Sequence, residues 1–587
     1  MHTTSTSTPT GGSFLFRENA PEGIFIREDI SEEQQLFART AEQFMREEVM
    51  PHAEKLYAHD WPATRQLLEH AGSLDLLRAD IPEQYGGMGL DKISSALISE
   101  QMALNPSFAA TFSAQTGIGT LPIVYFGTPE QRAKYLPRLA SGKLVTAFCL
   151  TEPDSGSDAL AAKTKATLSP DGRHYILRGQ KMWITNGGLA DLLIVFAKVD
   201  GDKFTAFIVE RGPGVVSGHD EKKLGLDGSS TTAITLEDCA VPVENLLGEI
   251  GRGHVVAFNT LNFGRLKLGN RNISLAKMAL NYAVAYALER RQFGRSISSF
   301  GLIKKKLAEM AVRCFVGDAI TFRTVGMVDR ALEAVDQGVP MQVMKIIEQF
   351  AVECSIIKVW TSETLGYVAD EGLQVFGGYG YSRDYPMERI VRDSRITRIY
   401  EGTNEINRMV ITNRLLKAAA EDFREILQSG ANGDARHSAS SSSGASGTGL
   451  EQRLADAKET GIAALRAIAS GRGEELKAQQ EVLAFVADIL IDTYTTESVY
   501  LRTAKLAGRH GAEAAKLPLA IASLYASDAA DRIIVNARNL AGMLNIHGAG
   551  AKIWESAQRL SSLPPIDTAA LRQDIAEAVL SARRYPW

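Results

Sequence analysis

The chain of 587 residues lacks the usual marks of a metal site, a nucleic-acid binder and a membrane protein. Its four cysteines are widely spaced and form no C-x-x-C pair, which argues against zinc and iron–sulfur sites and favours reduced thiols in the cytoplasm. The formal net charge is -5 and the basic residues are scattered, so a nucleic-acid partner is not expected. No apolar run approaches the length that a membrane-spanning helix needs. A globular protein of several domains is therefore expected, because one hydrophobic core cannot hold so long a chain.

Two segments have compositions that predict disorder or flexibility. Met1–Gly12 is rich in Thr and Ser and lacks the basic and apolar regions of a targeting signal, so residues 1–29 are predicted to form a disordered tail. Residues 431–449 are nearly all Gly, Ser, Ala, Asn and Thr. Because such a segment has no large apolar side chain to bury, residues 429–449 are predicted to be a flexible linker.

The remaining pattern predicts a mainly α protein with an inserted β domain. Residues 30–143 have helical periodicity that begins at Ser31, whose hydroxyl suits a helix N-cap. Over 144–253 the period falls to two, which predicts strands. Long helical segments return over 254–428 and predict a four-helix bundle, and residues 450–587 predict a further helical domain.

Four short motifs have a polar or Gly-rich character that suits a ligand, and each also has an ordinary structural explanation. The loop 148–158 is dense with hydroxyls and backbone donors that suit a phosphate or a polar ring edge, but a plain turn explains it at least as well. In 181–188, Trp183 precedes a polar turn, where a Trp is more often part of a core. The Gly-rich stretch 374–380 is typical of a helix C-cap with a turn. Glu401 stands between an aromatic residue and a glycine. In an apolar pocket its pKa would be raised, which a base for a weakly acidic carbon acid requires. The alternative is a solvated surface position, which is usual for a lone Glu.

Six motifs in this order resemble those of the acyl-CoA dehydrogenases. They are Pro82–Gly89, Thr151–Asp158, Lys181–Gly188, Glu289–Gly294, Gln374–Gly378 and Ile399–Glu405. The resemblance covers roughly residues 30 to 425 and is closest to the very-long-chain branch, which also has Asn262–Arg265, Phe300–Ile303 and an extra helical domain at the C-terminus. It implies a helical domain, a β-barrel-like domain and a four-helix bundle, followed by the extra helical domain.

The resemblance implies sites for FAD and for an acyl-CoA. The isoalloxazine would contact Phe148, Leu150, Thr151, Gly156 and Ser157 on one side and Trp183, Ile184 and Thr185 on the other. The adenine dinucleotide part of a partner subunit's FAD would contact Arg290, Gln292, Phe293, Gln374, Phe376, Gly377 and Gly378, and the flavin would be closed over by Thr403 and Glu405. The acyl-CoA would contact Ser157, Asn262, Arg265, Tyr400 and Gly402.

The same resemblance assigns the catalytic base to Glu401. Some branches of the family carry the base immediately before the arginine equivalent to Arg265, but here that position is Gly264. Glu401 would remove the α-proton of a saturated acyl-CoA while the flavin accepts the β-hydride, giving a trans-2-enoyl-CoA. The thioester carbonyl would accept hydrogen bonds from the Glu401 N–H and from the ribityl chain of the flavin.

The chain length of the substrate depends on two small residues. The segment 109–114 aligns with the acyl-pocket helix of the family, and Ala110 and Ala114 share a face because they are one helical turn apart. Their small side chains would leave a deep pocket for a long acyl chain. A tightly packed pair of helices is the alternative explanation.

The resemblance also implies partners and alternatives. Electrons would pass to an electron-transferring flavoprotein in the first step of fatty acid β-oxidation, and a homodimer is expected. The polar linker does not support the peripheral association with the inner membrane that the very-long-chain branch shows. An acyl-CoA oxidase, a flavin monooxygenase and a largely non-catalytic assembly scaffold are the alternatives on the same fold.

Overall fold

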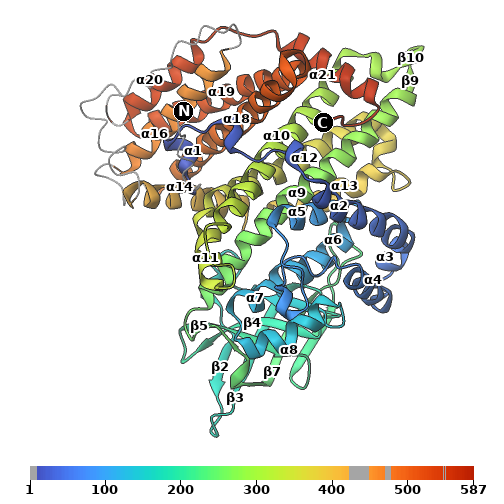
Figure 1. The fold of residues 1–587 in the computed structure, drawn as a ribbon, viewed down its shortest axis with the longest axis vertical. Coiled ribbons are helices and arrows are strands. Elements are labelled where there is room, and N and C mark those ends of the chain that lie inside the picture. The colour runs from blue at the N-terminus through green and yellow to red at the C-terminus, as the bar shows by residue number, and fades with distance from the viewer. Residues whose placement is uncertain (1–9, 422–448, 470–477, 546–547, 549) are drawn as a thin grey trace.

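The computed structural model describes residues 10–421, 449–469, 478–545, 548 and 550–587. Figure 1 shows the β domain at one end of the molecule, the C-terminal helices at the other and the long helices of the bundle between them. A mainly α architecture with an inserted β domain is thus confirmed. The predicted flexible linker falls on residues that, up to 448, lie outside the described part of the chain.

The N-terminal domain consists of short helices. Its first helix begins after Ser31, whose hydroxyl accepts a hydrogen bond from the Gln34 N–H at 3.2 Å, while the Gln34 side chain accepts one from the Ser31 N–H at 3.0 Å. The predicted N-cap is therefore confirmed. The helices are α2 (Glu32–Phe44), α3 (Ala53–Tyr57), α4 (Trp61–Ser73), α5 (Lys92–Gln101), α6 (Pro106–Ser113), α7 (Leu121–Phe126) and α8 (Pro129–Ala140), and a π-helical turn, η7 (Ala114–Gly119), continues α6.

The middle domain is one eight-stranded sheet. Its strands are β1 (Thr146–Cys149), β2 (Lys165–Leu168), β3 (His174–Thr185), β4 (Leu192–Val199), β5 (Lys203–Glu210), β6 (Val215–Asp220), β7 (Thr231–Pro242) and β8 (Leu246–Leu247). The order is β6-β7-β3-β2-β4-β5-β8, and β1 pairs with β4 in parallel. Strand β4 is buried almost throughout because it lies inside the sheet with both faces covered.

The bundle supplies the long helices that cross the middle of the molecule. They are α9 (Gly253–Glu289), α10 (Gly301–Leu332), α11 (Pro340–Gln349), α12 (Ala351–Phe376), α13 (Pro386–Arg395) and α14 (Asn404–Glu421). Helices α9 and α12 pack along one another, and α14 packs on α12. A two-stranded hairpin, β9 (Arg291–Gln292) and β10 (Arg295–Ser296), follows α9.

The C-terminal domain consists of α16 (Leu450–Ala469), α18 (Gln480–Ala514), α19 (Lys516–Met543), α20 (Gly550–Ser561) and α21 (Thr568–Ala582). Buried polar contacts dock it on the bundle. The Arg323 guanidinium of α10 donates to Glu497 Oε2 at 2.5 Å and to Ser498 Oγ at 2.8 Å, both on α18. Close to the end of the chain, the Tyr585 hydroxyl donates to Asp318 Oδ2 of α10 at 3.0 Å.

The prediction of a disordered tail over residues 1–29 is wrong for residues 10–29, which we call the N-terminal strap. Helix α1 (Ser13–Phe16) buries Phe14 against Tyr494 of α18, with ring centroids 4.9 Å apart. Glu28 Oε1 pairs with Arg502 Nη2 at 2.6 Å, and Asp29 Oδ2 pairs with Lys505 Nζ at 2.7 Å. The strap is ordered because distant helices supply an apolar surface and cations that its own local sequence does not reveal.

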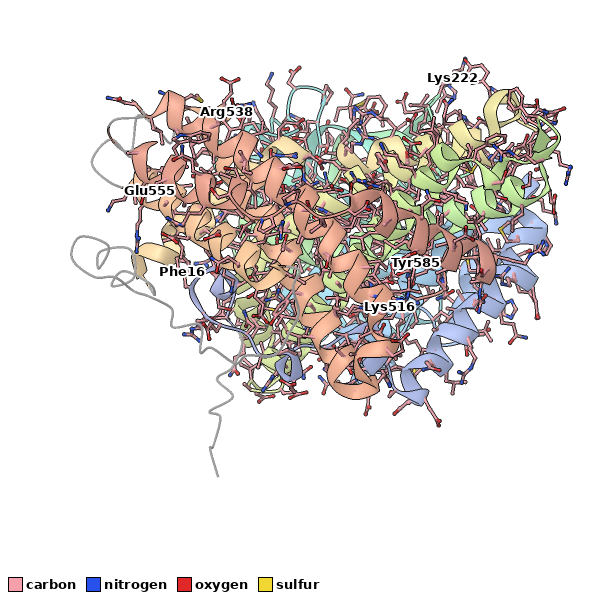
Figure 2. All side chains as sticks on the ribbon, turned by 90° about the horizontal axis from the view of Figure 1, so that it is seen from above. Phe16, Lys222, Lys516, Arg538, Glu555 and Tyr585 are labelled. Carbon is pink, nitrogen blue, oxygen red and sulfur yellow. The ribbon has the colours of Figure 1, made fainter. Side chains whose placement is uncertain are left out.

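The two ends of the described chain pack at separate places, the strap on α18 and the C-terminal end on α9 and α10 of the bundle. Figure 2, seen from above, shows Phe16 of the strap and Tyr585 well apart. Across the described residues, no helix is long and apolar enough to cross a membrane, and no three side chains gather that could hold a metal ion. All four cysteines are buried free thiols.

Candidate active site

The loop from Ile399 to Thr403 holds Glu401 in a fixed and unusual backbone conformation. Glu401 has a φ of +57° and Gly402 a φ of +82°, both in the left-handed region. The Asn407 side chain donates to the carbonyl of Gly402 at 2.8 Å and to that of Thr403 at 3.0 Å. Arg265 Nε donates to the carbonyl of Glu401 at 3.0 Å. These contacts compensate for the strain and fix the direction of the Glu401 side chain.

The Glu401 carboxyl lies in an environment that suits a base. Burial raises its pKa to about 7, against the opposing effect of the positive charges of Arg265, Arg271 and Lys358. Its Oε2 atom is shielded from solvent and has no hydrogen-bond partner among the described residues. A carboxylate without a partner is free to take a proton from a bound molecule.

Helix α9 approaches Glu401 at Gly264. A Cβ atom at position 264 would lie 2.7 Å from Glu401 Oε2, too close for any side chain without a shift of the carboxylate. Position 264 and position 401, which carry the base in different branches of the family that the motifs resemble, thus lie next to the same space in this structure. Because residue 264 is a glycine, the Glu401 carboxyl can occupy this space.

The predicted substrate-binding residues of α9 gather beside the same loop. The Arg265 Nη1 atom donates to Asn262 Oδ1 at 2.9 Å, and both residues are buried. Tyr400 directly precedes Glu401 in the loop, and its hydroxyl accepts a hydrogen bond from Arg271 Nη2 of α9 at 3.2 Å. Asn262, Arg265, Tyr400, Glu401 and Gly402 therefore form one cluster in this structure, whereas no hydrogen bond among the described residues joins the predicted Ser157 to it.

The two predicted flavin loops lie next to each other at the end of the sheet. The Met182 N–H donates to the carbonyl of Thr151 at 2.9 Å. A bulge in the pairing of β3 with β7, between Lys181 and Ile184, turns Trp183 outward, where it has a φ of +61° and is 58% exposed. The interpretation of Trp183 as a core residue is therefore wrong. Gly156 and Ser157 are exposed, Leu150, Thr151 and Thr185 are partly buried, and the side chains of Phe148 and Ile184 are buried in the sheet and leave only their backbones for a ligand.

A buried ion pair that sequence reasoning missed joins these loops. Lys181 Nζ lies 2.7 Å from Glu152 Oε1, and the lysine side chain is fully buried. Glu152 also accepts hydrogen bonds from the backbone N–H groups of Lys163 and Thr164. The sequence signal for this pair was an acidic residue in one motif and a basic residue in the other. Their spacing in the sequence does not show that the two motifs meet.

The residues predicted for the adenine dinucleotide form a second, distant group. The Arg290 guanidinium lies 5.4 Å from the ring centroid of Tyr379, in the turn η11 (Gly377–Tyr381) that follows Gln374 and α12. Gln292 and Phe293 lie in the adjoining hairpin, Phe293 is 92% exposed, and Phe376 stacks on Tyr286. Helix α9 rises by about 1.5 Å per residue, so roughly 40 Å separates Arg290 from the Glu401 end of the helix. Thr403 and Glu405, by contrast, adjoin Glu401.

The acyl-pocket segment contacts the same part of α9. Arg271 Nη1 donates to the carbonyl of Ala109 at 3.1 Å and to the hydroxyl of Ser113. Ala110 is partly exposed and Ala114 is 3% exposed. Sequence reasoning missed Arg271 altogether, because its polar neighbours Asn270 and Asn272 gave no signal of a site.

An open cavity of about 510 Å³ borders the loop Ile399–Thr403, called the catalytic loop because it carries the predicted base, on the side of α12 and α13. It is lined by Leu224, Glu363, Gly366, Tyr367, Asp370, Val391, Arg392, Ser394, Arg395 and Arg398. Glu363 connects it to the loop, because its Oε1 atom accepts a hydrogen bond from Asn404 Nδ2 at 3.0 Å. None of the lining residues was predicted as a site residue.

Four family models match the chain. They are described as the acyl-CoA dehydrogenase N-terminal domain over residues 31–143, the middle domain over 147–239, and C-terminal domains over 251–416 and 460–547.

Relatives and solved structures match as well. The chain is 41% identical over 582 residues to a probable acyl-CoA dehydrogenase of Bacillus subtilis, with 98% of each protein covered. It is 40% identical over 359 residues to the mitochondrial very long-chain specific acyl-CoA dehydrogenase of Macaca fascicularis, which covers 59% of this chain and 52% of that protein. The crystal structure of an acyl-CoA dehydrogenase complexed with FAD from Bacillus anthracis superposes with a TM-score of 0.93 at 40% identity, covering 98% of this chain and all of that one.

Proposed function

The chain belongs to the acyl-CoA dehydrogenase family, and from this premise we propose that it converts a long-chain fatty acyl-CoA to the trans-2-enoyl-CoA, as the first step of fatty acid β-oxidation. It is an oxidoreductase of an FAD-dependent family. The observation that best supports the reaction is the partly buried Glu401 carboxyl, whose Oε2 atom is shielded from solvent and has no partner among the described residues, and whose pKa is about 7.

Glu401 acts as the base in the proposed mechanism. It takes the proton from the α-carbon of the thioester, and the electron pair of that C–H bond forms the new double bond as a hydride leaves the β-carbon. Bound FAD supplies the acceptor for that hydride. The backbone N–H of Glu401 donates to the thioester carbonyl and stabilises the negative charge that develops on its oxygen. Asn262 and Arg265 hold part of the CoA thioester ligand next to the base.

The described residues fit FAD. Trp183, turned outward by the bulge, offers an aromatic face, and the neighbouring loop around Thr151 offers hydroxyls and backbone donors. The proposed flavin contacts are Phe148, Leu150, Thr151, Gly156, Ser157, Trp183, Ile184, Thr185, Thr403 and Glu405. The proposed dinucleotide contacts are Arg290, Gln292, Phe293, Gln374, Phe376, Gly377 and Gly378.

We also propose a homodimer, which the distance between these two groups supports. Arg290 and the exposed Phe293 lie roughly 40 Å along α9 from Glu401. This distance favours contacts of the two groups with different FAD molecules over contacts with one FAD in the same subunit. In the proposed dimer each subunit completes the FAD site of the other. We further propose a cytoplasmic enzyme that passes its electrons to an electron-transferring flavoprotein.

The variant Glu401→Gln tests the base. It should retain bound FAD and lose turnover by at least about a hundredfold, the scale of positioned acid–base catalysis. The checks are the flavin absorbance of the purified variant and its steady-state rate with an acyl-CoA. Substantial turnover by the flavin-loaded variant would reject Glu401 as the base.

Anaerobic titration with acyl-CoAs of increasing length tests the reaction itself. Bleaching of the flavin by long chains, and not by short ones, supports the proposed substrate. Rapid turnover with oxygen in the absence of an electron-transferring flavoprotein would indicate an oxidase instead. An FAD-loaded protein that no acyl-CoA bleaches would contradict the proposed function.

A further inference from the structure

Helix α9 carries four basic residues, and two of them have carboxylate partners. Lys267 Nζ lies 2.6 Å from Asp80 Oδ2, and Lys277 Nζ lies 2.6 Å from Asp318 Oδ1. Within the described part of the chain, Arg265 and Arg271 form no ion pair. Arg265 adjoins the base and is proposed to hold the CoA thioester, whereas Arg271 affects the base only through its charge and has no contact with the substrate assigned to it above.

Arg271 lies between the acyl-pocket helix and the catalytic loop. Its guanidinium donates to the Ala109 carbonyl and the Ser113 hydroxyl of α6 on one side, and to the Tyr400 hydroxyl at 3.2 Å on the other. All three acceptors are neutral oxygens. Three of the five N–H donors are used in these bonds, so two remain for a ligand.

The position of Arg271 places it along the acyl chain. Gly264, which faces the Glu401 carboxylate, and Arg271 are seven residues apart on α9 and so share one face, about 10 Å apart along the helix. A chain that starts at the thioester beside Glu401 and runs toward the partly exposed Ala110 passes between α9 and α6. It therefore passes the guanidinium, which is itself partly exposed.

A plain hydrocarbon is a poor neighbour for this cation. It would displace water from the two remaining donors without replacing their hydrogen bonds, which is costly for a charged group. A carboxylate would restore these bonds and neutralise the charge, and a hydroxyl or keto oxygen would restore them in part.

We propose that Arg271 is a specificity-determining residue that binds an oxygen function, best a carboxylate, on the acyl chain of the substrate. This inference rests on the proposed dehydrogenation and narrows its substrate class. The preferred acyl-CoA carries an oxygen acceptor at the depth of Arg271, and the base and hydride chemistry stay as described.

Matched acyl-CoA pairs test the proposal in the FAD-loaded enzyme. Each pair has the same chain length, one member ending in a methyl group and the other in a carboxylate or a hydroxyl. At the best length, kcat/KM should be at least about tenfold higher for the oxygen-bearing member. The carboxylate and hydroxyl arms show which oxygen function is preferred, and either preference supports the proposal. Equal or lower kcat/KM for every oxygen-bearing member would overturn it.

Three variants distinguish a residue that binds the substrate from one that only holds the two helices together. Arg271→Met should remove the preference, whereas Arg271→Lys should retain part of it. Because the charge of Arg271 also lowers the pKa of Glu401, the members of each pair are compared at a pH well above 7, where Glu401 stays deprotonated in the variant. Ser113→Ala removes one hydrogen bond between Arg271 and α6 and should keep the preference for the oxygen-bearing chain. If Arg271→Met slows both members of a pair by the same factor, Arg271 is a brace only. Should that variant lose its FAD, the comparison of pairs in the unaltered enzyme still decides. Flavin bleaching by methyl-ended chains alone would overturn this inference and leave the proposed dehydrogenase reaction intact.

Discussion

Glu401 and its three cationic neighbours set the chemistry at the scale of single residues. Burial alone would make the carboxyl a weak acid, and the charges of Arg265, Arg271 and Lys358 oppose that effect. The balance gives a carboxyl group whose pKa of about 7 suits the proposed removal of a proton near neutral pH. Removal of any one cation should therefore shift the pH at which the enzyme becomes active.

The pH dependence of kcat/KM tests this balance. Because a general base acts in its deprotonated form, the proposal predicts that activity is low well below pH 7 and rises through an apparent pKa of about 7. Steady-state rates from pH 5 to 9, with protein stability checked at each pH, give the profile. A rise centred near the ordinary pKa of a glutamate, about 4.3, would contradict the buried environment.

Lys358 offers a second test at the residue scale. Its Nζ atom donates to Asn404 Oδ1 at 2.7 Å, and burial together with the charge of Arg265 lowers its pKa to about 7. Lys358→Met removes a cation that lowers the pKa of Glu401, so the rise of activity should move to higher pH. The conservative variant Lys358→Arg should restore the profile toward that of the unaltered enzyme. An unchanged profile in Lys358→Met would show that the lysine has only a structural role.

The catalytic loop is the element that turns these residues into a site. Gly402 has a φ of +82°, and a Cβ there would lie 3.1 Å from Asn407 Nδ2 and 3.3 Å from Arg265 Nη2. Gly402→Ala should therefore strain the loop by roughly 1–2 kcal/mol and displace the two side chains that hold it. We expect kcat to fall by at least about tenfold with FAD still bound. Gly212→Ala, where no atom lies within 4 Å of the new Cβ and which belongs to no proposed site, is a control for the loss of a glycine in general. Equal rates for Gly402→Ala and the unaltered enzyme would show that the loop adapts.

Helix α6 is the element that the chain-length proposal depends on. Ala110→Gln fills space beside the proposed acyl chain and should shift the best substrate to a shorter chain, with kcat for short chains retained. The readout is kcat/KM across acyl-CoAs of increasing length. Ser107→Ala, at a buried position on the same helix, is a control for changes in its packing. A profile that does not change would refute the deep pocket.

Local sequence patterns predicted the elements better than the contacts between them. Ser31 and Gln34 are three residues apart and cap α2 as their spacing indicates, because a capping box is a local structure. The strands of the middle domain follow from the period of two for the same reason. The exposure of Trp183 depends on a bulge in the pairing with β7, and Arg271 meets Tyr400 only when α9 and the catalytic loop pack together. The cluster around Glu401 could be predicted from the family motifs, whereas the cations that set its pKa, apart from Arg265, could not.

At the scale of the whole molecule, buried charges join the strap, the bundle and the C-terminal domain. Glu497 of α18 is the meeting point. Its carboxylate accepts hydrogen bonds from Arg323 of the bundle, from Lys458 of α16 and, at 3.1 Å, from Asn19 of the strap. Sequence analysis missed this assembly, because a Thr- and Ser-rich start predicts disorder when its distant partners are unknown.

Glu497→Gln should destabilise the assembled molecule. The change leaves Arg323, whose side chain is 1% exposed, without its countercharge, and breaking such a buried pair costs about 3–5 kcal/mol. Thermal unfolding followed by flavin fluorescence and by circular dichroism measures the effect. Glu513→Gln, at an exposed position of the same helix, should change the stability by less than about 0.5 kcal/mol. Similar stability of both variants would mean that the three parts do not depend on this contact.

The strap also has a consequence for how the protein is made. Glu28 leaves the ribosome long before Arg502, which is 474 residues further along, so the strap cannot pack while most of the chain is being synthesised. Because domains tend to fold in the order of their synthesis, the dehydrogenase domains can form first while the strap stays accessible. Burial of Phe14 then becomes one of the last events of maturation. A protease present during translation should cut within residues 10–29, whereas the same protease added to the finished protein should leave this segment intact.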